Sequence, residues 1–493
     1  PGRQQGCDHV GGAVTAGALL DRAIVAMLIA LAVVGGSALA VLAAHGTVPD
    51  WLLPAGVAIA VVVAMRRCIA WPPVSSGRPV EWLLALAIVL ACASSIGYGA
   101  LATPSRHWDG ACVWDVKTWW LTQTPSLQQP FFRDGAVYCH SRDYPLLQPL
   151  LIGLGERLLG GGRVLFPLLF LLQTGLVGVA ALRAGGRGRT ACLLAVACAV
   201  TPWTTGTNAG SFDSGYADAF LGCCVTAVAA GLLLADRTLL LLGTFLLLLV
   251  KPEGLPYGGV LVLLLWLRGE TVLLRAAAAG WLGGAILWLP LQHDLHVAGQ
   301  SAVWWPVAGG VLALALLLLG SDALLHRRGA RLRTRAIAAV VVAPLCVLAP
   351  PLLMLELGDA TASMGSFLQV PGRALARLSW LPAVVGGSAE FGLLRGGFGL
   401  TFLLPIVALL VARWRDGALP APRLCWFVLL AAPLLLAPFL LSPIDDLAHH
   451  LRSRLPRLFV HWAGAMWILT GAALCGRDRQ VFSPPTARDA TAA

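Results

Sequence analysis

The chain has 493 residues, of which 58% are hydrophobic and only 12% are charged, and its mean hydropathy is +0.79. Soluble proteins need about a quarter of charged residues to cover their surface, so this composition excludes a soluble globular protein. The net charge of +11 does not indicate nucleic-acid binding, because the basic residues are scattered over short loops and no recognition fold is visible. In a membrane protein, an excess of arginine is first of all a signal of orientation.

Apolar blocks of about 18 to 27 residues recur along the chain, and each can cross a hydrocarbon core about 30 Å thick. The first block is too long for the core of a signal peptide, and no cleavage pattern follows it. We therefore predict an all-α polytopic membrane protein with about 12–14 transmembrane helices. The expected spans are 18–44, 51–65, 82–102, 164–182, 190–207, 217–235, 238–250, 255–267, 275–291, 304–320, 336–357, 398–412, 424–442 and 457–475.

The segment 144–161 is expected to be an interfacial helix and not a span, because its apolar run is short and contains Glu156 and Arg157. With this assignment, most lysines and arginines fall on the side that holds both termini, and the positive-inside rule makes that side cytoplasmic. The short helices 238–250 and 255–267 are separated by Lys-Pro-Glu-Gly. Such a break is tolerated only where the freed backbone faces protein or a wet cavity.

The loops between these spans define the expected domain organisation. We expect residues 1–475 to form a single transmembrane domain and residues 476–493 to form a cytoplasmic tail. On the external side, the long first loop covers 103–163 and the last loop covers about 443–457.

Charged residues at a membrane boundary are costly and are candidates for function. On the predicted external side they gather in the stretches RHWDGACVWDVKTWW, HSRDYPLL, FDSGYADAF, KPEG and DDLAHHLRSRLPR. Taken singly, each stretch has a structural alternative: an aromatic belt, a helix cap, a favourable helix start, an internal ion pair or a solvated loop. Together they predict an outward-facing cavity next to lipid, with cations that suit a phosphate and carboxylates that suit a general base.

The stretch WDGACVWDVK resembles the pattern W-D-x-x-x-x-W-x-x-K in the first external loop of bacterial GT-C-type membrane glycosyltransferases. The later stretches DYPLL, GYADA, KPEG and HLRSRLPRL follow the order and approximate spacing of motifs in that family. The resemblance extends over about residues 105–460. It implies a GT-C-like fold in which the long first external loop contains interfacial helices.

The resemblance also implies an activity, namely inverting transfer of a sugar from a polyprenyl-phosphate donor to an acceptor hydroxyl, usually with one external-loop aspartate as general base. The matching aspartate is Asp109, while Asp115 is a second acid that departs from the family pattern and is a further catalytic candidate. The remaining positions, which are expected to bind substrate, are Lys117, Asp143, Tyr144, Asp218, Lys251, Glu253, His450 and Arg457.

The expected partners are the polyprenyl-phosphate sugar donor, a glycan, lipid or protein acceptor, and membrane lipid, but no nucleic acid. The expected location is a bacterial inner membrane, with the active site on the external face and both termini in the cytoplasm. No cofactor is expected, since the spacing of His107, Asp109, His140 and Asp143 matches no strong metal-ligand signature and leaves a divalent metal as a weaker alternative. A secondary transporter or flippase for a lipid-linked or anionic substrate is the main alternative function, and a structural assembly factor is another.

Two of the twelve cysteines, Cys112 and Cys139, lie in the long first external loop. We predict a disulfide between them, because that compartment of a bacterial envelope is oxidising. Two free thiols are the alternative. Most of the other cysteines sit inside apolar blocks, where a thiol behaves as a small hydrophobe.

Overall fold

The structure is a computed structural model, and it describes residues 16–67, 79–102, 105, 109–134, 144–201, 210–296, 320–321, 376–394, 398–435, 439 and 446–475. In these residues the regular structure is helical and no strand occurs. The expected span 336–357 and nearly all of 304–320 lie outside the described residues.

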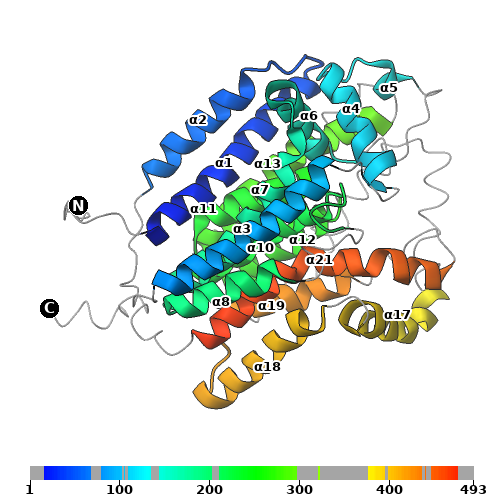
Figure 1. Cartoon of the computed structure of the whole chain (residues 1–493). Coiled ribbons are helices and arrows are strands. Elements are labelled where there is room, and N and C mark those ends of the chain that lie inside the picture. Colours follow the sequence, from blue (N-terminus) through cyan, green and yellow to red (C-terminus); the bar gives the residue numbers. More distant parts are fainter. Residues whose placement is uncertain are drawn as a thin grey trace.

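The N-terminal half is built from long apolar helices and from short helices that follow the third of them. The helices are α1 (Ala16–Ala43), α2 (Leu52–Met65), α3 (Pro79–Ala102), the π-helix η1 (Gly110–Asp115), α4 (Val116–Gln123), α5 (Pro130–Arg133), α6 (Leu147–Leu159), the 3-10 helix η2 (Gly162–Val164), α7 (Leu165–Arg183), α8 (Gly188–Ala199) and α10 (Asp218–Leu234). As Figure 1 shows, α4, α5 and α6 gather at one end of the bundle.

The C-terminal half continues the bundle and ends with one long helix. Its helices are α11 (Arg237–Val250), α12 (Gly254–Arg268), α13 (Thr271–His296), the 3-10 helix η4 (Arg377–Trp380), α17 (Leu381–Gly387), the π-helix η5 (Ser388–Leu394), α18 (Gly399–Asp416), α19 (Pro422–Ala431), the 3-10 helix η6 (Ala432–Leu435) and α21 (Leu447–Leu474). Helices α17 and α18 lie along one side of α21 in Figure 1.

Helices occur at every expected span that falls within the described residues. Within the described residues, four segments are long and apolar enough to cross a membrane, and they are Gly17–Ala43, Pro79–Ala102, Gly162–Arg183 and Thr271–Leu289. Several others, such as α10 and α11, are apolar but shorter. The described part of the chain is thus all-helical and has helices of membrane-spanning length and composition.

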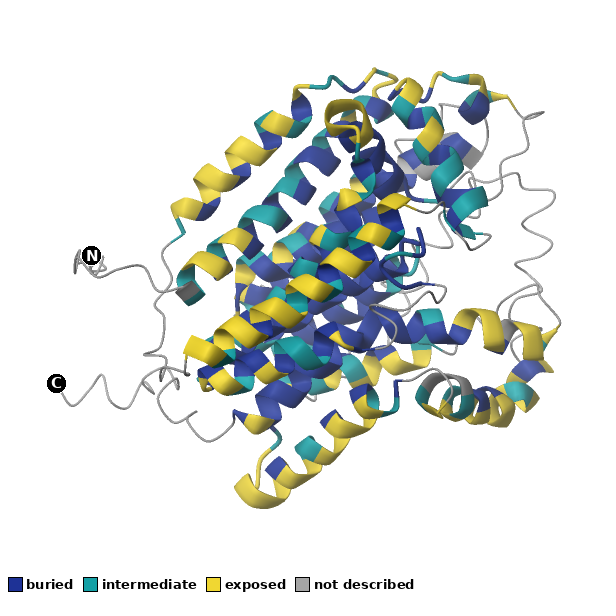
Figure 2. Cartoon of the chain, viewed as in Figure 1, coloured by how far each residue is buried: buried dark blue, intermediate teal, exposed yellow. Residues whose placement is uncertain are grey.

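The exposed surface of the bundle carries large apolar side chains along whole helices. Helix α2 exposes Val61, Val62 and Val63, and α18 exposes Leu400 and Leu410, each by about half or more. The exposed stretches of α2, α3 and α18 are visible in Figure 2, whereas α10 is almost wholly buried. Soluble proteins rarely expose apolar surfaces of this extent. These faces are those that lipid would cover.

Helix α11 connects two groups of charged residues at opposite ends of the bundle. It begins after Asp236 and ends before Lys251, so that its 14 residues span ~21 Å at 1.5 Å per residue. We call the end that holds Lys251 the site end. At the opposite end, Arg183 on α7 donates to Asp236 at 2.8 Å and to Asp21 on α1 at 3.3 Å, and Arg67 after α2 also pairs with Asp236. This buried group joins the ends of four helices.

Two segments differ from expectation. Residues 447–457, expected as part of a loop, form the first turns of α21, because Asp446 caps the helix by accepting from the His449 amide and because Leu451 and Leu455 are buried one turn apart. Helix α6 forms inside the expected segment 144–161, but it is buried from Leu147 to Gly155. It therefore packs within the protein over most of its length and does not expose one polar face as an interfacial helix does.

Candidate functional site

The site is organised around Asp218, which opens α10 and is only 1% exposed. Its Oδ1 accepts a hydrogen bond from Lys251 Nζ at 2.8 Å and lies 2.8 Å from His461 Nε2. Its Oδ2 accepts from Arg457 Nε at 3.1 Å. A buried carboxylate is tolerated only when it is paired and hydrogen-bonded, and here three donors satisfy it.

Arg457 joins this buried carboxylate to a more accessible one. Its Nη1 donates to Oδ2 of Asp109 at 2.7 Å, while its guanidinium also pairs with Asp218. The Asp109 side chain is 30% exposed and the Arg457 side chain is 15% exposed. The guanidinium lies over the ring of Tyr216, with 4.2 Å between its carbon and the ring centroid. Arg457 is therefore held by two carboxylates and one aromatic face.

Lys251 and Glu253 lie in the turn between α11 and α12, and their side chains are 3.3 Å apart at the nearest atoms. Burial alone lowers the pKa of Lys251, but the carboxylates of Asp218 and Glu253 outweigh it, and the pKa is raised overall. Burial alone raises the pKa of Glu253, but the ammonium of Lys251 outweighs it and lowers that pKa. Both groups are therefore charged at neutral pH. We call Asp109, Asp218, Lys251, Glu253, Arg457 and His461 the charged cluster.

His461 lies one turn after Arg457 on α21, so that both side chains point to the same side of that helix. Since a carboxylate only accepts, the tautomer that fits the contact with Asp218 carries its proton on Nε2. The other ring nitrogen, Nδ1, then accepts from the hydroxyl of Tyr257 on α12 at 3.3 Å. The hydrogen-bonded series of Asp218, His461 and Tyr257 is fully buried and connects α10, α21 and α12.

The loop before α10 fits tightly against the start of η1 because glycines stand at the contacts. A Cβ on Gly110 would lie 2.5 Å from the Ser214 carbonyl oxygen, which is too close for any other residue type. Gly215 has a φ of +79°, in the left-handed region, and its carbonyl accepts from Gln148 Nε2 at 2.9 Å. These contacts bring Asp109, which directly precedes η1, next to Arg457.

Two tyrosines border the charged cluster. Burial raises the pKa of Tyr216 to about 12, and the nearby Arg457 only partly offsets this. Burial, followed by the charge of Glu253, also raises the pKa of Tyr144. Both phenols are therefore neutral at physiological pH, and each offers an aromatic wall with one hydroxyl.

Some of the predicted site residues lie outside the charged cluster. Asp115 pairs with Arg163 at 2.5 Å and is not bonded to Arg457 or Lys251. Lys117 is fully buried, donates to the Tyr144 carbonyl oxygen at 3.3 Å, and lies 5.7 Å from the ring centroids of Trp114 and Tyr144. Asp143 lies outside the described residues, as does the side chain of His450.

The structure thus brings together five predicted residues from four separate motifs, which are Asp109, Asp218, Lys251, Glu253 and Arg457. Sequence analysis missed His461 and Tyr257, which stand inside apolar stretches. The signal that could have revealed His461 is its position four residues after Arg457 on one helix face.

Two further predictions concern metals and thiols. Among the residues that the structure describes, no group of three or more His, Cys, Asp or Glu side chains is placed to hold a metal ion. The predicted absence of a cofactor stays a prediction. Cys112 has a free thiol on η1, while Cys139 lies outside the described residues, so that the predicted disulfide also stays a prediction.

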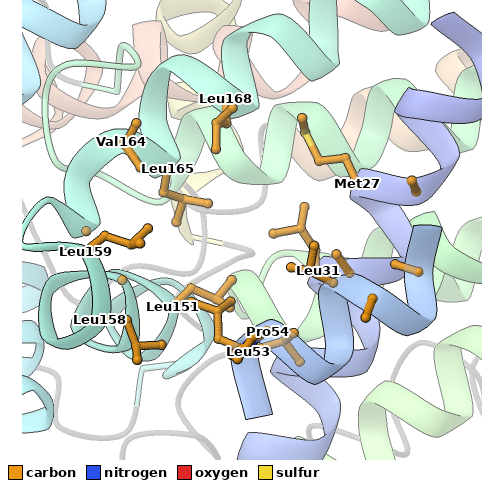
Figure 3. A pocket seen from close by; sticks show the side chains of 18 of the residues that line it. Met27, Leu31, Leu53, Pro54, Leu151, Leu158, Leu159, Val164, Leu165 and Leu168 are labelled. Carbon is orange, nitrogen blue, oxygen red and sulfur yellow. The ribbon is translucent and has the colours of Figure 1, made fainter. Parts of the chain in front are cut away.

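An apolar groove of about 750 Å³ lies on another part of the bundle. Figure 3 shows side chains of α1, α2, α6 and α7 along it, among them Met27, Leu53, Leu151 and Leu168. Its residue Val61 also belongs to the exposed apolar face of α2, so that the groove continues the surface that lipid would cover. No member of the charged cluster lines it.

Comparison of the chain with protein-family models, with curated proteins and with solved structures gave no significant match.

Proposed function

We propose that the protein is an inverting membrane glycosyltransferase of the GT-C type, which transfers a sugar from a polyprenyl-phosphate donor to an acceptor hydroxyl. The observation that carries this proposal is the charged cluster. Residues from separate stretches of the chain, 109, 218, 251–253 and 457–461, converge at one end of an apolar helix bundle. Carboxylates, cations and aromatic walls are the groups that a phosphate-linked sugar and an acceptor hydroxyl require.

The two cations of the cluster are assigned to the donor phosphate. Arg457 has the planar guanidinium that binds a phosphate through two hydrogen bonds, and Lys251 supplies a compact charge beside it. Glu253 is assigned to the sugar, because its Oε2 is buried and no donor among the described residues bonds to it. A sugar hydroxyl would satisfy this acceptor, and a buried acceptor without a partner costs about 1–3 kcal/mol.

Asp109 is assigned the role of general base, because it is the more accessible of the two carboxylates that hold Arg457. The acceptor oxygen forms the new bond to the anomeric carbon, and its proton passes to Asp109. The bond between that carbon and the phosphate oxygen breaks, and its electron pair stays on the polyprenyl phosphate. Arg457 and Lys251 stabilise this leaving phosphate, and Asp109 later releases its proton to solvent.

We further propose that the site end faces the outside of a bacterial inner membrane and that the termini lie in the cytoplasm. The proposal is supported by the excess of arginine in the loops of the opposite side and by the positive-inside rule. The polyprenyl chain of the donor then lies in the bilayer beside the bundle. The acceptor is a glycan, a lipid or a protein whose hydroxyl reaches Asp109.

The proposal is tested with the full chain in lipid vesicles and a panel of polyprenyl-phosphate donors with labelled sugars. We expect release of polyprenyl phosphate together with a labelled acceptor from at least one donor. The exposed pair Asp50–Arg157 lies apart from the charged cluster, and the variant Asp50→Asn serves as the control with normal release. Movement of a lipid-linked substrate between leaflets without cleavage would identify a transporter instead and contradict the proposal.

A further inference from the structure

The cations assigned to the donor phosphate are already neutralised by the protein. In the charged cluster, the carboxylates of Asp109, Asp218 and Glu253 face the cations Lys251 and Arg457. With His461 counted as neutral, the formal charge of the cluster is −1. A phosphate brings further negative charge, so it binds well only if one of these carboxylates gives up its cation.

Neither Asp218 nor Glu253 is placed to release Arg457 for the phosphate, for two different reasons. Asp218 is 1% exposed and holds Lys251 and Arg457 from inside the bundle, so separation would leave a buried charge without a partner. Glu253 has a side chain that is 32% exposed, but it pairs with Lys251, which is 3% exposed and is also held by Asp218, so that its movement would not free the guanidinium of Arg457. Moving Asp218 would break the contacts that join α10 to the end of α11 and to α21.

Asp109 is the carboxylate that can separate from Arg457. Its side chain is 30% exposed, and it takes only the Nη1 end of Arg457, while Nε and Nη2 stay with Asp218. It stands at the start of η1 and not within a buried helix. A phosphate oxygen in the place of the Asp109 oxygen would keep Arg457 fully bonded and its ring contact with Tyr216 intact.

We infer that the donor phosphate binds by displacing Asp109 from Arg457, so that the base is released for the acceptor only when the donor is in place. The inference rests on the proposed function for the identity of the phosphate. This exchange links donor binding to activation of the acceptor. Without donor, Asp109 stays paired with Arg457, and with donor bound, Asp109 is free to accept the proton of the acceptor. Arg457 then binds the phosphate in the loaded enzyme and pairs with the base, Asp109, in the empty enzyme.

This exchange predicts that Asp109 competes with the donor. If the Asp109–Arg457 pair is formed in ~90% of empty molecules, the apparent affinity for the phosphate is about tenfold weaker than the intrinsic affinity. Removal of the Asp109 charge should therefore tighten binding, although the same change removes the base. A residue that only supports the shape of the site would have the opposite effect.

The test measures the dissociation constants of a polyprenyl phosphate and of inorganic phosphate for the purified full chain in detergent. Wild type is compared with Asp109→Asn and Asp109→Ser, so that one unstable variant does not decide the result. Asp50→Asn is the matched control, since Asp50 is also paired with an arginine but has no contact with the cluster. We expect about tenfold tighter binding of both probes by the Asp109 variants and no change for Asp50→Asn.

Unchanged or weaker binding of the polyprenyl phosphate by the Asp109 variants would overturn the inference and leave the proposed function standing. A tightening confined to the lipid probe would also overturn it, because the exchange concerns the phosphate group and not the chain. If wild type binds no polyprenyl phosphate at all, the proposed function fails, and the inference fails with it.

Discussion

Arg457 donates a hydrogen bond of 2.7 Å to Asp109, although 348 residues separate the two in the chain. The contact joins the first turns of α21 to the segment that follows α3, and through Asp218 it reaches the interior of the bundle. An ion pair between an accessible carboxylate and a largely buried guanidinium suits a site where an anion binds and a proton moves.

Asp218 should be the residue on which the integrity of the site depends. Asp218→Asn keeps the shape but leaves Lys251 and Arg457 without their buried counter-charge, which costs about 3–5 kcal/mol. We expect a clear drop in the thermal unfolding temperature in detergent together with loss of transfer. Asp213→Asn in the loop before α10 is the control, since Asp213 accepts from the neighbouring Ser211 hydroxyl at 2.6 Å and does not belong to the charged cluster. Equal unfolding temperatures of the two variants would show that the stability of the site does not depend on Asp218.

Arg457 should be needed for its geometry as well as for its charge. Arg457→Lys keeps the charge but cannot bind Asp218 and a phosphate through separate nitrogens. The loss of one charged hydrogen bond, about 1.5–3 kcal/mol, should weaken polyprenyl-phosphate binding by roughly ten- to hundredfold. Arg452→Lys on the exposed side of α21 is the matched control, because Arg452 donates to a carbonyl of its own helix and does not belong to the charged cluster. Comparable affinities for both variants would remove Arg457 from the phosphate site.

The surface pair of Asp50 and Arg157 should give a pH-dependent contribution to stability. The hydrogen bond from Arg157 lowers the pKa of Asp50 below its ordinary value of 3.8. A carboxyl with a lowered pKa stabilises the folded state above the ordinary value and loses this effect as the pH falls through the folded value. Asp50→Asn should therefore lower the unfolding temperature at pH 7, and this difference should shrink as the pH falls below 3.8 and through the lowered pKa of the folded state. A difference between wild type and variant that does not change with pH would mean that the amide disturbs something other than the ion pair.

Cys112 and Cys139 are predicted to form a disulfide in the oxidised protein. A variant that keeps only these two cysteines is unfolded and treated with maleimide, with and without reductant. We expect labelling only after reduction, and a variant with Cys112 alone should label in both conditions. Closing this loop should stabilise the fold by roughly 3–4 kcal/mol in the entropy model. Full labelling of the unreduced protein would exclude the bridge.

The all-helical, membrane-spanning character of the described residues was predictable because apolar blocks of spanning length leave few alternatives. The helices at 165–183, 218–234 and 237–250 differ from the expected spans by one residue or none at each end. The start of α21 was missed because its charges, such as Arg452 and Arg454, outweighed the buried leucines between them. Periodicity along a helix, and not the density of charge, was the better signal there.

The site was only partly predictable, because the contacts between motifs depend on how distant helices pack. Sequence analysis identified Asp109, Lys251 and Arg457 as candidates, but it could not tell that Asp115 would pair with Arg163 and lie outside the cluster. It also treated the arginines on the side of the termini as orientation signals, whereas one of them, Arg183, forms a buried ion pair. No pattern along one chain reports such pairings.

The most direct test of the account is single-turnover sugar transfer by wild type, Asp109→Asn and Asp115→Asn at saturating donor. A general base contributes about a hundred- to ten-thousandfold to the rate, so we predict a loss of that size for Asp109→Asn with donor binding retained. Asp115→Asn should keep most of its activity, because Asp115 pairs with Arg163 and has no contact with Arg457. Near-normal transfer by Asp109→Asn, with transfer abolished in Asp115→Asn, would contradict the account and move the catalytic role to Asp115.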